Sequence, residues 1–153
     1  MPTFSGSRGA FTPATTNDNW TLEADTAGDV LRVLSIGWGG RLTASTGYRT
    51  RWTRPTTAGA STFTALTHAS HDPAYNTPLG RIGTFATAPV LAADPAGNLY
   101  EQDWNAHGGA GYIILPQDKE WKIVNGLLQA QLSCRNIAGV DANGSNYTVT
   151  WDE

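Results

Sequence analysis

Turn-forming residues interrupt this chain so often that no stretch of about 11 residues keeps a helical spacing of apolar side chains. Glycine, proline, asparagine and aspartate recur in segments such as TAGD, GWGG, DPAGN, AHGGAG and DANGSN. The runs between these segments are short, and most of them alternate apolar with polar residues, which is the pattern of β-strands. The sequence therefore predicts an all-β fold that requires no helix.

About eight segments have this strand pattern, which is the strand number of a jelly roll. They are 19–24, 29–38, 41–54, 82–92, 99–104, 111–116, 127–135 and 147–151. In 41–54, Tyr48 and Trp52 share one parity, which predicts a buried face, whereas Arg49 and Arg51 fall on the other parity. We expect a two-sheet sandwich, of jelly-roll type.

The length of 153 residues fits one domain. Residues 1–16 are polar and predict an extended N-terminal arm, followed by a single sandwich domain over 17–153. Residues 55–81, rich in Thr, Ala, Ser and Pro, predict a long loop of the kind that often carries function. The sequence begins without a signal-peptide pattern, has no apolar run long enough to span a membrane, and contains one cysteine, so we expect synthesis in a reducing cytoplasm.

Arginines are concentrated between residues 30 and 71, where the chain has no Asp or Glu, although its net charge is −3. Three interpretations are open: an exposed strand face, a docking surface for an acidic protein partner, or a nucleic-acid surface. Nucleic acid is the least favoured, because the chain is not basic overall and Tyr48 and Trp52 face away from the neighbouring arginines. The candidate partner-binding residues are Arg41, Arg49, Arg51 and Arg54.

Six tryptophans are many for this length. Trp20, Trp52 and Trp151 lie on apolar parities and are expected in the core. Exposed tryptophans on a β-sandwich can instead stack on sugar rings, and the candidates for this role lie at strand ends. They are Trp38, Trp104 and Trp121, for which a core role is still favoured.

Catalytic motifs are absent: the sequence has no Gly-x-Ser-x-Gly and no phosphate-binding loop of the Walker type. His68, His71 and Asp72 could converge in a turn, but no fourth metal ligand is suggested, so we expect neither a metal nor a cofactor. The carboxylates of Glu101, Asp103, Asp118 and Glu120 could form a hydrolytic pair, yet nothing fixes their separation. Cys134 continues an apolar parity and is expected to be inert. We predict a protein that is not an enzyme.

The order of these features resembles small β-sandwich virion proteins of tailed phages, particularly head decoration (cement) proteins. The features, in order, are the polar arm, DVLRVLSIGWGGRLTASTGYRTRWTRPTT, WNAHGGAGYIILPQDKEWKIVNG, and LQAQLSCR and NYTVTWDE near the end. Beyond the arm, the resemblance covers about 17–153. It implies a structural protein, often trimeric, made in the host cytoplasm and assembled on the capsid exterior with the major capsid protein as partner. A carbohydrate- or receptor-binding module is the alternative, and a hydrolase comes third.

Overall fold

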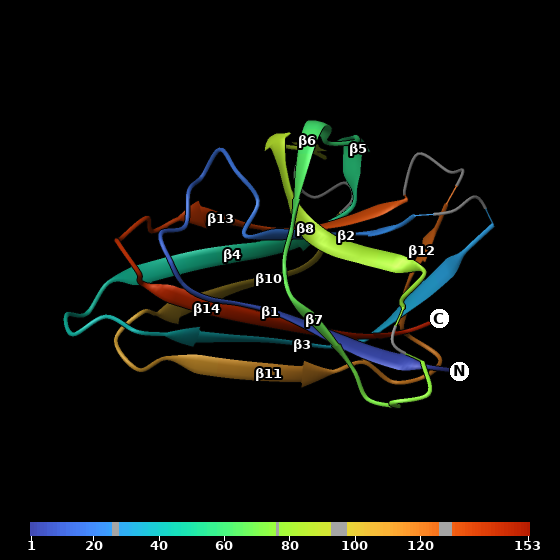
Figure 1. Cartoon of the computed structure of the whole chain (residues 1–153). Helices are drawn as coiled ribbons and strands as arrows, with labels where there is room; N and C mark the ends of the chain where they lie inside the picture. Colours follow the sequence, from blue (N-terminus) through green and yellow to red (C-terminus); the bar gives the residue numbers. More distant parts are fainter. Residues whose placement is uncertain (26–27, 76, 93–97, 126–129) are drawn as a thin grey trace.

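The computed structural model describes residues 1–25, 28–75, 77–92, 98–125 and 130–153, and these contain β-strands and no helix (Figure 1). The strands are β1 (Thr3–Phe11), β2 (Trp20–Ala24), β3 (Val30–Gly40), β4 (Gly47–Thr53), β5 (Pro55–Thr57), β6 (Ala60–Ala65), β7 (His68–Ser70), β8 (Gly80–Thr87), β9 (Val90–Leu91), β10 (Asn98–Asn105), β11 (Ala110–Ile114), β12 (Trp121–Val124), β13 (Gln131–Ala138) and β14 (Ser145–Asp152). The predicted all-β class is confirmed, with fourteen strands rather than eight.

Two antiparallel sheets form the layers of the sandwich (Figure 1). The first has the strand order β11-β3-β14-β1-β7, with β12 also paired to β3, and the second has the order β10-β4-β13-β2-β8-β6. Eight of these strands form a core set: β1, β3, β11 and β14 of the first sheet and β2, β4, β10 and β13 of the second. Successive strands of this set switch sheets at every step except from β4 to β10, which pair within the second sheet. This connectivity is that of a jelly roll, as the sequence predicted.

The segment between β4 and β10 is an insertion into this jelly roll. The prediction of a long loop over 55–81 is wrong, because residues 55–81 contain β5 to β7 and the start of β8. β7 pairs with β1, β8 pairs with β2, and β6 pairs with β8, so the insertion extends both sheets on one side of the sandwich. Most side chains of β6 are exposed, so the strand lacks the apolar alternation by which strands are recognised. Its Phe63 contacts Phe85 of β8, with ring centroids 4.9 Å apart.

The N-terminal residues also need a correction, because most of the predicted arm is a strand of the domain. β1 lies between β14 and β7. Phe4 is fully buried, and its ring centroid lies 5.9 Å from that of Trp151. At Gly6 an added Cβ would come within 2.7 Å of Ile82, so only glycine fits between the sheets there. A strand that buries one large side chain and one glycine looks polar in the sequence, although it is part of the core.

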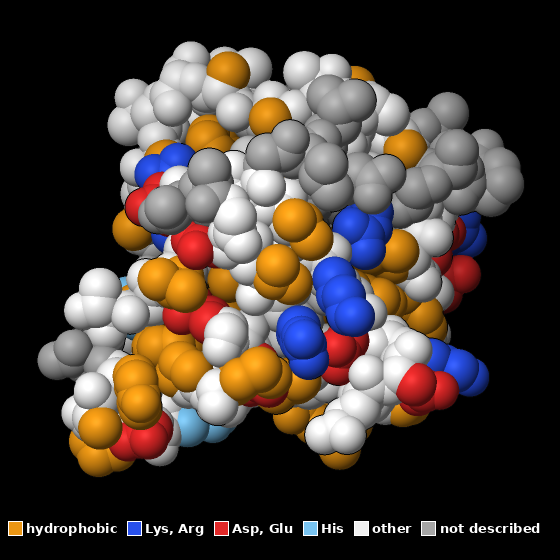
Figure 2. Space-filling model, turned by 90° about the vertical axis from the view of Figure 1, so that its right-hand side faces the viewer, with side chains coloured by type: hydrophobic (Ala, Val, Ile, Leu, Met, Phe, Trp, Pro, Cys, Tyr) orange, Lys and Arg blue, Asp and Glu red, His pale blue; other side chains and the backbone are white. Residues whose placement is uncertain are grey.

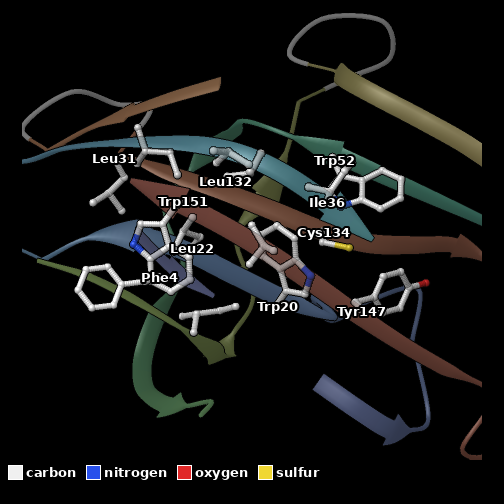
Figure 3. Packing of buried hydrophobic residues seen from close by; sticks show 14 of the residues in the cluster. Phe4, Trp20, Leu22, Leu31, Ile36, Trp52, Leu132, Cys134, Tyr147 and Trp151 are labelled. Carbon is white, nitrogen blue, oxygen red and sulfur yellow. The ribbon is translucent and has the colours of Figure 1, made fainter. Parts of the chain in front are cut away.

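The core lies between the two sheets and is rich in aromatic side chains (Figure 3). Trp20, Trp52 and Trp151 are fully buried, as predicted. Tyr48 is buried on the same face of β4 as Trp52, and Cys134 is buried on β13. The alternation read from the sequence therefore identified the buried face of the central strands correctly.

Three predicted strands have clearly different bounds in the structure. The predicted strand 41–54 is reduced to β4, which begins only at Gly47 and ends at Thr53. The segment 82–92 is not one strand, because β8 ends at Thr87 and β9 begins at Val90, with Pro89 between them. Proline cannot donate a backbone hydrogen bond to a neighbouring strand, which explains the break. Of the predicted strand 127–135, residues 127–129 lie outside the described residues, and β13 continues to Ala138.

Candidate functional site on the uncovered side of the sandwich

The two lateral sides of the sandwich differ. Strands of the insertion extend the β1 and β2 side. On the opposite side the second sheet ends at β10, and the first ends at β11 and, further along β3, at β12 (Figure 1). In the described part of the chain, β10 pairs only with β4, and β11 pairs only with β3. An unpaired strand edge exposes backbone N–H and C=O groups that can pair with another chain. We call this β10 and β11 side the uncovered side.

The short strand β11 lacks the charges, the proline and the bulge that protect many edge strands. Its sequence, AGYII, contains no charged residue and no proline, and its pairing with β3 is regular. Ile114 is 73% exposed, the same fraction as the N-terminal Met1. Natural edge strands commonly carry lysine, proline or a bulge that prevents edge-to-edge pairing. β11 is therefore suited to pairing with a partner strand. The sequence predicts a strand here, over 111–116, but nothing in the sequence indicates that this strand forms an edge.

The arginines of β4 lie beside the other edge strand and face acids of their own chain. Arg49 binds Asp103 of β10 with two hydrogen bonds, Nε to Oδ1 at 2.6 Å and Nη2 to Oδ2 at 3.2 Å. Arg51 donates from Nε to Glu101 Oε2 at 2.7 Å. The hydrogen bonds from Arg49 lower the pKa of Asp103. A partner docking here would meet a row of paired charges instead of a basic strip.

Arg41 and Arg54 are not part of this row. Arg41 lies before the start of β4, where its backbone N–H donates to Gly144 O at 3.1 Å. Arg54 follows the end of β4 and donates from Nη1 to the carbonyl oxygen of Lys122 in β12 at 2.8 Å. The structure brings together only Arg49 and Arg51 of the four predicted residues. At the end of the molecule where both termini lie, basic side chains are also close to acidic ones (Figure 2).

The three tryptophans considered for sugar stacking are packed against other groups. Trp38 is only 9% exposed and contacts the ring of Trp52 at a centroid distance of 5.2 Å. Trp104 is half-buried, lies against Tyr48 at 5.0 Å, and donates its indole N–H to Thr50 Oγ1. Trp121 is half-buried and packs against the core. Their surroundings favour the structural role for all three.

A buried hydrogen-bond network, which no pattern in the sequence indicates, holds Trp104 in place. Its centre is Asn136 Oδ1, which accepts hydrogen bonds from Asn19 Nδ2, Thr50 Oγ1 and Tyr147 Oη at 2.9, 3.0 and 2.6 Å. Burial raises the pKa of Tyr147 well above its usual value, so the phenol stays protonated and donates. Buried polar groups require such partners. The network is a structural device of the core.

Groups for catalysis or metal binding are dispersed. In the described ranges, no three His, Cys, Asp or Glu residues are grouped so that they could hold a metal ion. His68 and His71 are exposed, and Asp72 Oδ1 accepts a hydrogen bond from the backbone of Ala74. Burial raises the pKa of the Cys134 thiol well above its usual value, which disfavours the reactive thiolate. Glu120 lies within 4 Å of Arg32 and Lys122, and Asp118 is exposed on a turn.

Comparisons with known proteins identify no relative: no family model, no curated protein and no solved structure matches this chain. The described residues also contain no helix that is long and apolar enough to cross a membrane.

Proposed function

We propose that this chain is a structural virion protein that binds the exterior of a phage capsid and stabilises it, as head decoration proteins do. The observation that carries the proposal is the uncovered side, where the first sheet has the uncharged edge strand β11 and the second sheet has a row of ion pairs at its edge. Its asymmetry supports assembly, because the insertion protects one side of the sandwich and leaves the other available. The sequence resemblance to decoration proteins supports the same assignment and implies a trimer.

In this proposal, the uncovered side makes two contacts, one with another copy of the chain and one with the major capsid protein. β11 pairs with another copy of the chain through its backbone, and Ile114 is buried in that contact. The charges of β4 and β10 meet the major capsid protein. Charged groups at an interface mainly raise the association rate and select the partner, and apolar contacts supply more of the affinity. The Arg49 and Arg51 guanidinium groups keep their charge at all working pH values and can bind carboxylates with two parallel bonds.

The self-association is tested with a charge placed on the edge. Ile114→Lys introduces the protection that β11 lacks. Val140→Lys is the matched control, because Val140 is an exposed apolar residue outside β11. Light scattering of the unmodified chain and of Val140→Lys should give an oligomer, and Ile114→Lys should give a 16.3 kDa monomer. A monomer in all three samples, or an oligomer that Ile114→Lys leaves unchanged, rejects β11 as the self-association surface.

The virion assignment is tested on particles. Deleting the gene from the phage genome that carries it should leave capsids that are less resistant to heat and that bind the recombinant chain during co-sedimentation. Arg49→Ala combined with Arg51→Ala should reduce the bound fraction, whereas Ile114→Lys tests the contribution of oligomerisation to attachment. Absence of the chain from purified virions, detected by mass spectrometry, would exclude a structural virion role.

A further inference from the structure

The outer face of the first sheet carries a groove that is separate from the contacts proposed above. It lies over β3, between β11 and β14, and has a volume of about 250 Å³. The floor is the backbone of β3 at Gly37 and Gly39. An added Cβ at Gly37 would lie 2.5 Å from Thr148 Oγ1, and one at Gly39 would lie 2.5 Å from Asn146 Oδ1. The two glycines therefore make room for side chains of the neighbouring strand.

Tyr112 of β11 forms one wall of the groove. Its hydroxyl donates to Ser35 Oγ at 2.7 Å, and its Cδ2 lies 3.1 Å from the position of an added Cβ at Gly37. The ring thus leans from β11 over β3 and is held at its far end. Tyr112 is nevertheless 62% exposed, more than the other large aromatic side chain that is exposed, Tyr75. The result is a fixed aromatic surface open to solvent.

Polar side chains of β14 form the opposite wall. Asn146 and Thr148 lean over β3 toward Tyr112, as the distances to the two glycines show. No hydrogen bond of either side chain occurs within the described residues, so an amide and a hydroxyl are available to a ligand. No charged side chain lines the groove. Its chemistry suits a neutral ligand that has both an apolar face and hydroxyl groups.

We propose that this groove binds a single neutral sugar residue. The C–H face of the sugar ring stacks on Tyr112, and its hydroxyl groups exchange hydrogen bonds with Asn146 and Thr148. The volume is below the roughly 300–1,000 Å³ of pockets that enclose drug-sized ligands, which limits the site to one ring. Because Tyr112 leans over β3, pairing at the backbone edge of β11 leaves the groove accessible. The site would add glycan binding to the surface of the assembled protein.

The test is an NMR titration of the ¹⁵N-labelled chain with the methyl glycosides of glucose, galactose, mannose, rhamnose and N-acetylglucosamine. At least one of them should shift the amide signals of Gly37, Gly39 and Asn146. Tyr112→Ala should lower the affinity at least about tenfold, as expected for loss of an aromatic anchor. Thr148→Val keeps the shape of the side chain but removes its hydroxyl and should also weaken binding.

Tyr75→Ala is the matched control, since it removes another exposed tyrosine, one that lines neither the groove nor the proposed self-association contact. It should bind the sugar as the unmodified chain does, and melting curves establish that every variant is folded. The proposal is overturned if none of the five glycosides shifts the groove signals. It is equally overturned if the shifts survive in folded Tyr112→Ala. Either result leaves the capsid co-sedimentation assay unaffected, so the two proposals fail independently.

Discussion

Phe4→Ala tests whether the N-terminal segment is a structural part of the domain. Phe4 is fully buried between the sheets, with its ring stacked on Trp151 and edge-on to His68 at a centroid distance of 6.4 Å. Truncation of a buried phenylalanine to alanine lowers the free energy of unfolding by about 3–5 kcal/mol. For a chain of this size, that loss corresponds to a melting temperature lower by about 6–20 °C. It is a large part of a typical stability of about 5–15 kcal/mol.

The assay is urea unfolding followed by circular dichroism, with Ser7→Ala as the control. Ser7 lies on the same strand and is exposed, so its substitution should change the free energy of unfolding by less than about 0.5 kcal/mol. If residues 1–16 were an arm outside the domain, neither substitution would change the free energy of unfolding. If Phe4→Ala unfolds within about 1 kcal/mol of the unmodified chain, which is below the range for a buried phenylalanine, then β1 does not pack as described and the reasoning fails.

Three further outcomes are expected. Arg49→Ala should lower the free energy of unfolding by less than about 1 kcal/mol in the urea assay, since the ion pairs of Arg49 are exposed. Arg51→Ala should lower it more, by about 1–2 kcal/mol, because Arg51 is less exposed. The free energy of unfolding should fall as the pH rises above about 10, because the pKa of Tyr147 is raised in the folded chain and the phenol ionises more readily in the unfolded chain. Urea midpoints measured between about pH 8 and 11 should show this decline, and the decline should be smaller in Tyr147→Phe. Gly139→Ala should lower the melting temperature strongly, because φ is +86° and the added Cβ would lie against the ring of Tyr48.

Local patterns determined much of the fold. The alternation in β4, β13 and β14 identified Trp52, Cys134 and Trp151 as buried, because side chains of a strand alternate between its two faces. Frequent turn residues correctly excluded helices among the described residues and indicated a sandwich. These inferences succeed because they need only neighbours in the sequence.

The candidate sites depended on neighbours far along the chain. The sequence placed Arg49 and Arg51 on the polar face of a strand, but only the pairing of β4 with β10 shows that Asp103 and Glu101 lie opposite them. Tyr112 was one residue of a predicted strand. Its position as an open aromatic wall depends on Gly37 and on the side chains that β14 places across β3.

Only the tertiary structure decided which polar segments belong to the sheets. β6 exposes most of its side chains, and β1 buries only Phe4 and Gly6, so neither shows the apolar alternation that predicts a strand. Each is held by backbone pairing with a strand distant in sequence, β1 with β14 and β6 with β8. Every residue except proline offers the same backbone hydrogen-bonding groups, so the amino-acid sequence does not indicate which distant strand pairs with β1 or β6. The sequence by itself determined the class of fold and the buried faces of its central strands, and the packing of distant strands determined its edges and surfaces.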